Sequence, residues 1–247
     1  MPFTLDNQDK AQKFRKKRLK NVCKAKIWNP MSEGPYLVLH WLPISNKPLF
    51  DFDDLTPTNF SKFFPMESKK AELPNLDGIR FYSGMGDRTA ESTNNFHNQT
   101  RKHKTRHFWN AQVFYSGALE IAFALHFQED ESGEKKYIEP DYIVNHLQNA
   151  MDQFKKCMES FKICNPIIVG VSLLRVMDYR FLTVNIGGGN SHAHSDRKKI
   201  ILPGKRIEKA QDIGNIEFPI FNMLWRSFGL LDCPYYNEDG TRKNLNG

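Results

Sequence analysis

Two histidines and an aspartate occupy alternate positions of a glycine-rich segment, GGGNSHAHSD, a spacing that could align three metal ligands along an extended strand. His192, His194 and Asp196 would then support a metal-assisted hydrolase or nuclease. A zinc site needs three or four ligands, however, and no further Cys or His lies at a familiar spacing. The composition of the segment favours a hairpin tip. We therefore expect no metal ion and keep the hydrolase as an alternative.

Glu120 is an acid within an apolar segment, so its carboxylate must reach either solvent or a partner. With His126 on the same side of a strand it could act as a general base, and otherwise it is a solvent-facing or ion-paired strand residue. The chain has no GxSxG elbow, no HExxH motif and no P-loop. We favour a non-enzymatic protein with no cofactor and no catalytic residue, and leave catalysis open.

The positive charge of the chain is concentrated near its N-terminus. Nine basic residues and no acid lie between Lys10 and Lys26, whereas the net charge of the whole chain is only +7. A second cluster, RKHKTRH, begins at Arg101, and a weaker one runs from Arg197 to Lys209. Closely spaced cations attract polyanions, although such a run can also be the solvated face of a helix. The predicted contacts to a DNA or RNA backbone are Lys13, Arg15, Lys16, Lys17, Arg18, Lys20, Arg101, Lys102, Lys104 and Arg106.

The composition is that of a globular protein, with 247 residues of which 40% are hydrophobic and 26% charged, and it excludes disordered, collagen-like and coiled-coil classes. The longest apolar run, Ile167 to Leu174, is far shorter than the roughly 20 residues of a membrane span. Four scattered cysteines suit a reducing compartment. We expect a cytoplasmic protein without a membrane partner.

Asp9 to Lys26 has good helix formers but only a thin apolar stripe, so we expect a helix that docks loosely or serves as a linker. Residues 1–27 are accordingly interpreted as a basic helical linker segment, and residues 28–247 as a single domain. Tyr36 to Ile44 reads as a strand buried on both faces, and Ser45 to Pro74 as an irregular covering segment.

Alternation predicts a hairpin in the middle of the chain, with Ser116-Gly117 as its loop. The core-facing residues of its second strand should be Ile121, Phe123, Leu125 and Phe127. An amphipathic helix opens at Pro140, Ile167–Val171 and Tyr179–Val184 form a strand pair, and a last helix runs over residues 217–228. The predicted fold class is α+β: an antiparallel or mixed sheet with β-hairpins, packed by two or more helices, plus a basic N-terminal helix.

An ordered set of short motifs also resembles a known group. In chain order these are FRKKRLKNV, GPYLVLHWLPIS, LPNLDGIRFYSG, NAQVFYSGALEIAF, PIIVGVSLLRVMDYRF and FPIFNMLWRSFGL with YYNEDG. Their order and spacing are similar to those of the C-terminal half of bacterial proteins whose N-terminal half is a Schlafen AlbA-type DNA-binding domain. The resemblance covers about Phe14 to Gly240.

The resemblance implies a companion domain. The group is described as DNA-binding or ATP-binding on account of its AlbA-type half, which we expect to be absent from this chain because the sequence starts just before the basic helix. The chain would then be a split-gene product, a truncated copy or a free-standing relative. Matching positions are Asn75, Asp77 and Gly78 in a turn, and Gly117 and Glu120 in a Gly-x-x-Glu strand; the resemblance attaches no catalytic role to them.

These observations favour a nucleic-acid-associated binding module, the companion domain of Schlafen AlbA-type DNA-binding proteins. The alternative is a protein-interaction or oligomerisation domain that docks a separately encoded AlbA-type domain or a second copy of the chain.

Overall fold

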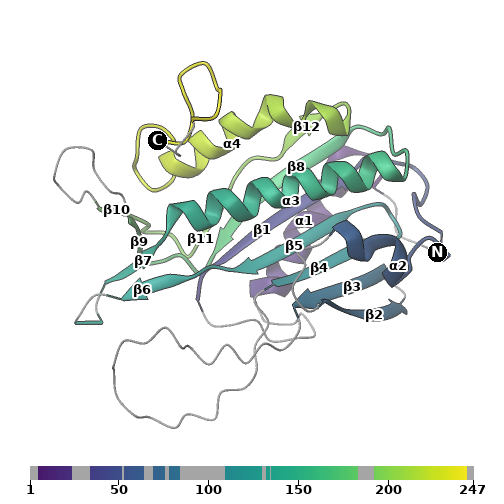
Figure 1. The fold of residues 1–247 in the computed structure, drawn as a ribbon, viewed down its shortest axis with the longest axis horizontal. Helices are drawn as coiled ribbons and strands as arrows, with labels where there is room; N and C mark the ends of the chain where they lie inside the picture. Colours follow the sequence, from purple (N-terminus) through teal and green to yellow (C-terminus); the bar gives the residue numbers. More distant parts are fainter. Residues whose placement is uncertain are drawn as a thin grey trace, which may run out of the picture.

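The computed structural model describes residues 5–23, 34–51, 53–63, 69–75, 78–83, 109–129, 132–133, 135–182 and 192–243. A large central sheet is covered by helices on both faces, and a smaller sheet lies at one end (Figure 1). The predicted α+β class is confirmed. Within these ranges, none of the helices has the length and apolar character needed to cross a membrane.

The central sheet has eight strands in the order β11-β8-β1-β5-β4-β3-β2, and β12 also pairs with β8. Every pairing in it is antiparallel. The predicted hairpin is confirmed as β4 and β5, with Gly117 in the left-handed region at φ +83°. The strands are β1 (Tyr36–Pro43), β2 (Lys69–Asn75), β3 (Gly78–Ser83), β4 (Trp109–Phe114), β5 (Leu119–Ala124), β8 (Ile167–Leu174), β11 (Lys199–Ile201) and β12 (Lys205–Ile207).

The smaller sheet has the order β10-β9-β7-β6, and its β7 and β9 are parallel. Its strands are β6 (Phe127–Glu129), β7 (Lys136–Ile138), β9 (Tyr179–Leu182) and β10 (His192–His194). The predicted pairing of the segments that became β8 and β9 is wrong, because these strands belong to different sheets. β8 has no edge free for β9, since β1 occupies one side of it and β11 and β12 occupy the other.

Helices α3 (Pro140–Ser160) and α4 (Gly214–Arg226) cover one face of the central sheet (Figure 1). The main core lies between them and the sheet, and includes Trp41 of β1 and Phe154 of α3, whose rings meet edge to face at 6.0 Å. Short helical segments complete this side: α2 (Pro57–Phe60), Ser61–Phe63 and Ala210–Ile213. The segment predicted to be irregular therefore contributes α2 and its buried phenylalanines, and it also supplies β2.

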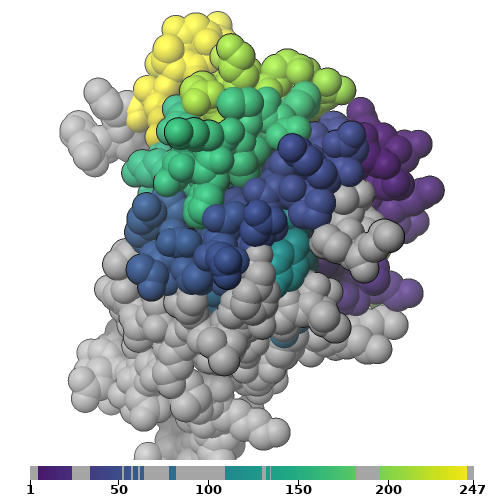
Figure 2. All heavy atoms as spheres, turned by 90° about the vertical axis from the view of Figure 1, so that its right-hand side faces the viewer, coloured from purple at the N-terminus to yellow at the C-terminus, as the bar shows by residue number. Residues whose placement is uncertain are grey.

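Helix α1 (Gln8–Cys23) covers the opposite face of the sheet. In Figure 2 its purple atoms lie on the opposite flank of the molecule from the green atoms of α3 and α4. Leu19 and Val22 pack against Val38, Ala122 and other small apolar residues of the sheet. β1 is consequently buried on both faces, as predicted. The segment predicted as a loosely docked linker is thus a packed layer of the structure.

Candidate functional site

Helix α1 has two sides of different chemistry. Its buried residues, Ala11, Arg15, Arg18, Leu19 and Val22, recur at helical spacing and face the sheet. Two of these five are arginines, and their guanidinium groups lie in a polar zone between two small apolar clusters. A buried charge is costly unless it is paired or hydrogen-bonded, so the partners of the arginines determine how α1 is held.

Arg18 pairs with Glu120 across the interface between α1 and β5. Its Nε donates to Oε2 at 3.0 Å and its Nη2 donates to Oε1 at 2.6 Å, a bidentate arrangement. The same Nη2 donates to Oε1 of Gln112 at 3.1 Å, and the guanidinium lies 5.0 Å from the ring centre of Phe114. His40 Nε2 lies 2.8 Å from Oε2 of Glu120, the oxygen that also accepts from Arg18 Nε. Glu120 is therefore fully engaged within a buried cluster.

The electrostatics of this cluster favour one protonation state. Burial alone would raise the pKa of Glu120, but the charge of Arg18 and the hydrogen bonds from His40 and Arg18 hold that pKa well below its usual range. Burial lowers the pKa of His40, although Glu120 opposes this shift. The ion pair is therefore Arg18 with Glu120, and neutral His40 donates from Nε2 to the carboxylate.

Arg15 is held by neutral oxygens from β8 and from Leu202, which follows β11. It donates to the carbonyl of Val171 at 2.7 Å, the carbonyl of Leu202 at 2.9 Å and the hydroxyl of Ser172 at 2.8 Å. Burial lowers the pKa of Arg15 to about 10, so the group stays charged at neutral pH. Its guanidinium lies over Gly170, where a β-carbon would come within 2.5 Å of Nε. The absence of a side chain at Gly170 makes room for this arginine.

A row of paired residues crosses the sheet beneath the two arginines. The strand register places Gln112 beside Glu120, Glu120 beside His40, and His40 beside Gly170. α1 lies across this row. The two buried arginines bond directly to groups of β4, β5 and β8, and His40 of β1 joins the cluster through Glu120. These contacts fix both the position and the rotation of α1.

The other side of α1 carries Lys13, Lys16, Lys17 and Lys20, all exposed. These positions also recur at helical spacing, so they form a single stripe, here called the lysine face. Lys10 is engaged with Asp6 at 2.6 Å. Among the residues that the structure describes, no ion pair involves the four lysines of this face.

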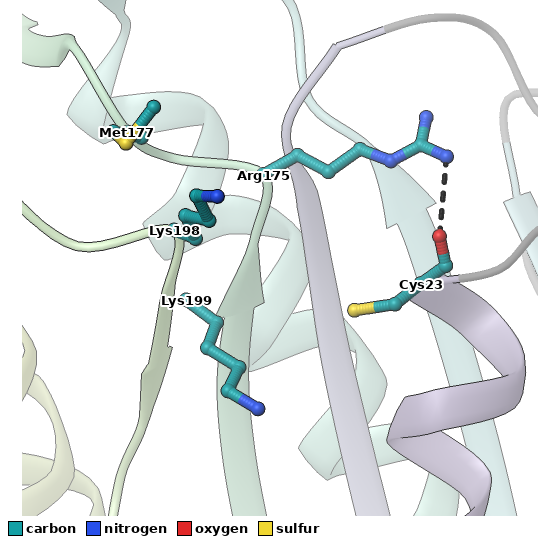
Figure 3. A pocket seen from close by; sticks show the side chains of 5 residues that line it. All are labelled: Cys23, Arg175, Met177, Lys198 and Lys199. Carbon is teal, nitrogen blue, oxygen red and sulfur yellow. Dashed lines mark hydrogen bonds between the residues drawn. The ribbon is translucent and has the colours of Figure 1, made fainter.

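A small pocket lies at the C-terminal end of α1, lined by Cys23, Arg175, Met177, Lys198 and Lys199 (Figure 3). Its volume is about 460 Å³. Arg175 Nη2 donates to the Cys23 carbonyl at 3.3 Å, so the pocket joins α1 to the turn after β8 and to β11. Burial raises the pKa of the Cys23 thiol, although Lys199 and Arg175 oppose the shift.

The structure divides the ten predicted nucleic-acid contacts into three groups. Arg15 and Arg18 are 2% and 8% exposed and are engaged inside the protein, so in this fold they hold α1 in place and do not face solvent. Lys13, Lys16, Lys17 and Lys20 face solvent. The remaining four, Arg101, Lys102, Lys104 and Arg106, lie outside the described residues. The cations at the pocket extend the basic surface of the lysine face. Arg175 was not predicted as a contact because it does not belong to a cluster of basic residues in the sequence.

The turn and strand positions on which the sequence resemblance rests have structural roles where they are described. Asn75 pairs with Gly78 between β2 and β3, and Asp77 lies outside the described residues. Gly78 has φ +140°, and a β-carbon there would collide with the Val113 carbonyl. Glu120 pairs with Arg18 and His40, which supports its interpretation as an ion-paired residue, whereas His126 is exposed and lies near Glu139.

The backbone of the histidine segment includes β10, in which His192 and His194 occupy alternate positions, and Asp196 beyond it is exposed. The side chains of His192 and His194 lie outside the described part of the structure, so the metal-assisted alternative stays a prediction. In the described part of the chain, no group of three or more His, Cys, Asp or Glu side chains could hold a metal ion.

Comparison of the chain with protein-family models, with curated proteins and with solved structures finds no match. The geometry of α1 and its surroundings is therefore the basis for assigning a function.

Proposed function

We propose that this protein is a non-enzymatic nucleic-acid-binding module whose contact surface is the lysine face of α1. The observation that carries the proposal is that the basic residues of α1 lie on two different sides of the helix. Arg15 and Arg18 face the sheet and anchor the helix. The four lysines of the lysine face are exposed to solvent. The resemblance to the companion half of Schlafen AlbA-type proteins points in the same direction. The module would act beside a DNA-binding partner domain.

The anchoring matters because binding costs less when the contact groups are already positioned. A free basic helix loses conformational entropy when it meets a polyanion, whereas α1 is already held by hydrogen bonds from its arginines to β5 and β8. Four lysines on one stripe can follow the regularly spaced phosphates of a nucleic acid. Such contacts are independent of base sequence.

The test is a titration of labelled DNA and RNA at several salt concentrations. If the four lysines each neutralise one phosphate, the logarithm of the binding constant should fall with the logarithm of salt with a slope of about −3.6 for duplex DNA. The double variant Lys16→Glu/Lys17→Glu should weaken binding about tenfold or more at low salt, to a similar extent for all base sequences.

A matched control is Lys155→Glu/Lys156→Glu, which changes the net charge equally but lies on α3, across the sheet from α1. This control should lose much less affinity, because the charges it reverses are outside the contact surface. Equal losses in both variants would show that only net charge matters and would contradict the proposal. Absence of salt-dependent binding would also overturn it, and would favour the alternative of a protein-interaction or oligomerisation domain.

A further inference from the structure

The pocket at the C-terminal end of α1 differs chemically from the lysine face that leads to it. Its lining combines the apolar side chains of Met177 and Cys23 with the cations Arg175, Lys198 and Lys199 (Figure 3). The three cations donate hydrogen bonds and attract anionic groups, and together they outweigh the partial negative charge at the end of the helix. The pocket therefore suits a flat group with an apolar face and acceptor atoms, flanked by anionic groups.

The turn that forms one wall of this pocket holds an unusual backbone. Arg175 and Asp178 adopt positive φ angles of 58° and 69°, which residues other than glycine seldom do. Between them Val176 is fully buried while Met177 is 43% exposed, so the turn projects a large apolar side chain beside three cations. Backbone of this kind recurs at ligand-binding sites as well as in tight turns.

Arg175 is also held in place before any ligand arrives. Its guanidinium lies 4.9 Å from the ring centre of Tyr36, and its Nη1 donates to the Tyr36 hydroxyl at 3.0 Å. With the bond from Nη2 to the Cys23 carbonyl, both terminal nitrogens have partners. A planar cation that is fixed in this way offers a stacking surface for a base.

The lysine face leads toward the pocket. Gln12 of α1 lies close to Gly204, and Cys23 lies in the pocket with Lys199, so both residues mark the side of α1 that faces β11 and β12. Lys16 follows Gln12 by one helical turn and lies on the same side. A nucleic-acid backbone that contacts the lysines can therefore reach the pocket within its next nucleotides.

From this arrangement, and resting on the proposed function, we infer that the protein prefers single-stranded nucleic acid and places one unpaired base in the pocket, against Met177 and beside the cations. A duplex keeps its bases stacked in its interior and can use the lysine face alone. The single strand can use both surfaces. Stacking of one base is sequence-tolerant, because every base has an apolar face.

The experiment compares the affinities of the full chain for a single strand and for a blunt duplex of the same length, at matched salt. The variant Met177→Ser removes the apolar wall without disturbing the core, since Met177 is exposed. It should weaken single-strand binding about fivefold, which is the low end of the affinity loss expected when one stacked base loses its partner. Duplex binding should be unchanged. Leu231→Ser is the control, because Leu231 is an exposed apolar residue outside the pocket.

A second measurement locates the bound strand directly. In a Cys164→Ser background, which removes the exposed thiol, alkylation of Cys23 is followed by mass spectrometry at saturating nucleic acid. The single strand should slow alkylation at least fivefold, and the duplex should have little effect.

The outcomes separate the two proposals. If neither nucleic acid binds, the proposed function fails and the inference fails with it. Three other results would overturn the pocket inference and leave the proposed function intact. These are equal affinity for the single strand and the duplex, an equal loss of both affinities in Met177→Ser, and equal reactivity of Cys23 in the presence of either nucleic acid.

Discussion

Arg18 and Glu120 are separated by 102 residues in the sequence and form a bidentate ion pair beneath helix α1, with oxygen–nitrogen distances of 2.6 and 3.0 Å. Both side chains are almost completely buried. Burying two charges costs desolvation free energy, which their mutual attraction offsets only when the geometry is good. The pair therefore does more to specify where α1 docks than to add net stability.

Removing one charge of this pair should be far more harmful than removing both. Glu120→Gln leaves the Arg18 charge buried without a counter-ion, and we expect it to lower the free energy of unfolding by about 3 kcal/mol or more. Arg18→Met/Glu120→Gln should lose clearly less than the sum of the two single variants, because neither charge remains. Urea denaturation of the four proteins measures this coupling. Strictly additive losses would contradict the interpretation.

Replacing the anchoring arginine should affect stability, while replacing a lysine of the outer side should affect binding. Arg15→Lys retains the charge but cannot reach three oxygens with a planar group, so we expect a loss of about 2 kcal/mol in unfolding free energy. Lys16→Gln should change stability by less than about 0.5 kcal/mol and should weaken nucleic-acid binding. Denaturation and binding measured on the same samples test this separation. A Lys16→Gln variant as unstable as Arg15→Lys would refute it.

Gly170 provides a steric test of the same anchor. In Gly170→Ala the new methyl group would occupy the space of the Arg15 guanidinium, and we expect a loss of about 1–3 kcal/mol through overpacking. Gly214→Ala at the start of α4 is the matched control, since no atom lies within 4 Å of the added carbon. Thermal unfolding should show a lower Tm for the first variant alone. The idea would be abandoned if both variants melted like the parent.

Two histidines make stability depend on pH in a predictable direction. Burial lowers the pKa of His146 from 6.5 to about 4, and burial also lowers that of His40. As the pH falls below 6.5 the unfolded chain takes up these protons first, so stability is complete above pH 6.5 and declines between pH 6.5 and about 4. The slope is at most about 1.4 kcal/mol per pH unit for each proton.

The variant His146→Gln should reduce this slope, because it removes one of the two groups, and exposed His126→Gln should leave it unchanged. Urea denaturation at pH 7, 6, 5 and 4.5 measures the slope. An unchanged slope in His146→Gln would contradict the assignment. Below about pH 4.3, protonation of carboxylates adds a further loss in the same direction, because the pKa of Glu120 is lowered in the folded protein.

The elements that depend on neighbouring residues could be predicted from the sequence. The β4–β5 hairpin follows from alternation on both sides of Ser116-Gly117, and α3 follows from its apolar face and from Pro140 in its first turn. The two-sided burial of β1 follows from its unbroken apolar run. The α+β class was predictable from these elements alone, because each pattern repeats within a few residues.

The role of the basic helix depends on contacts that form only in the folded protein. Lysine and arginine contribute equally to a count of charge, so the sequence could not separate Arg15 and Arg18 from the lysines between them. Their partners Val171 and Glu120 lie 156 and 102 residues away, and come together only when β1, β5 and β8 align. The same alignment brings Arg175 and Lys199 to the end of α1. Contacts of this range are set by strand order and register, which local patterns do not encode.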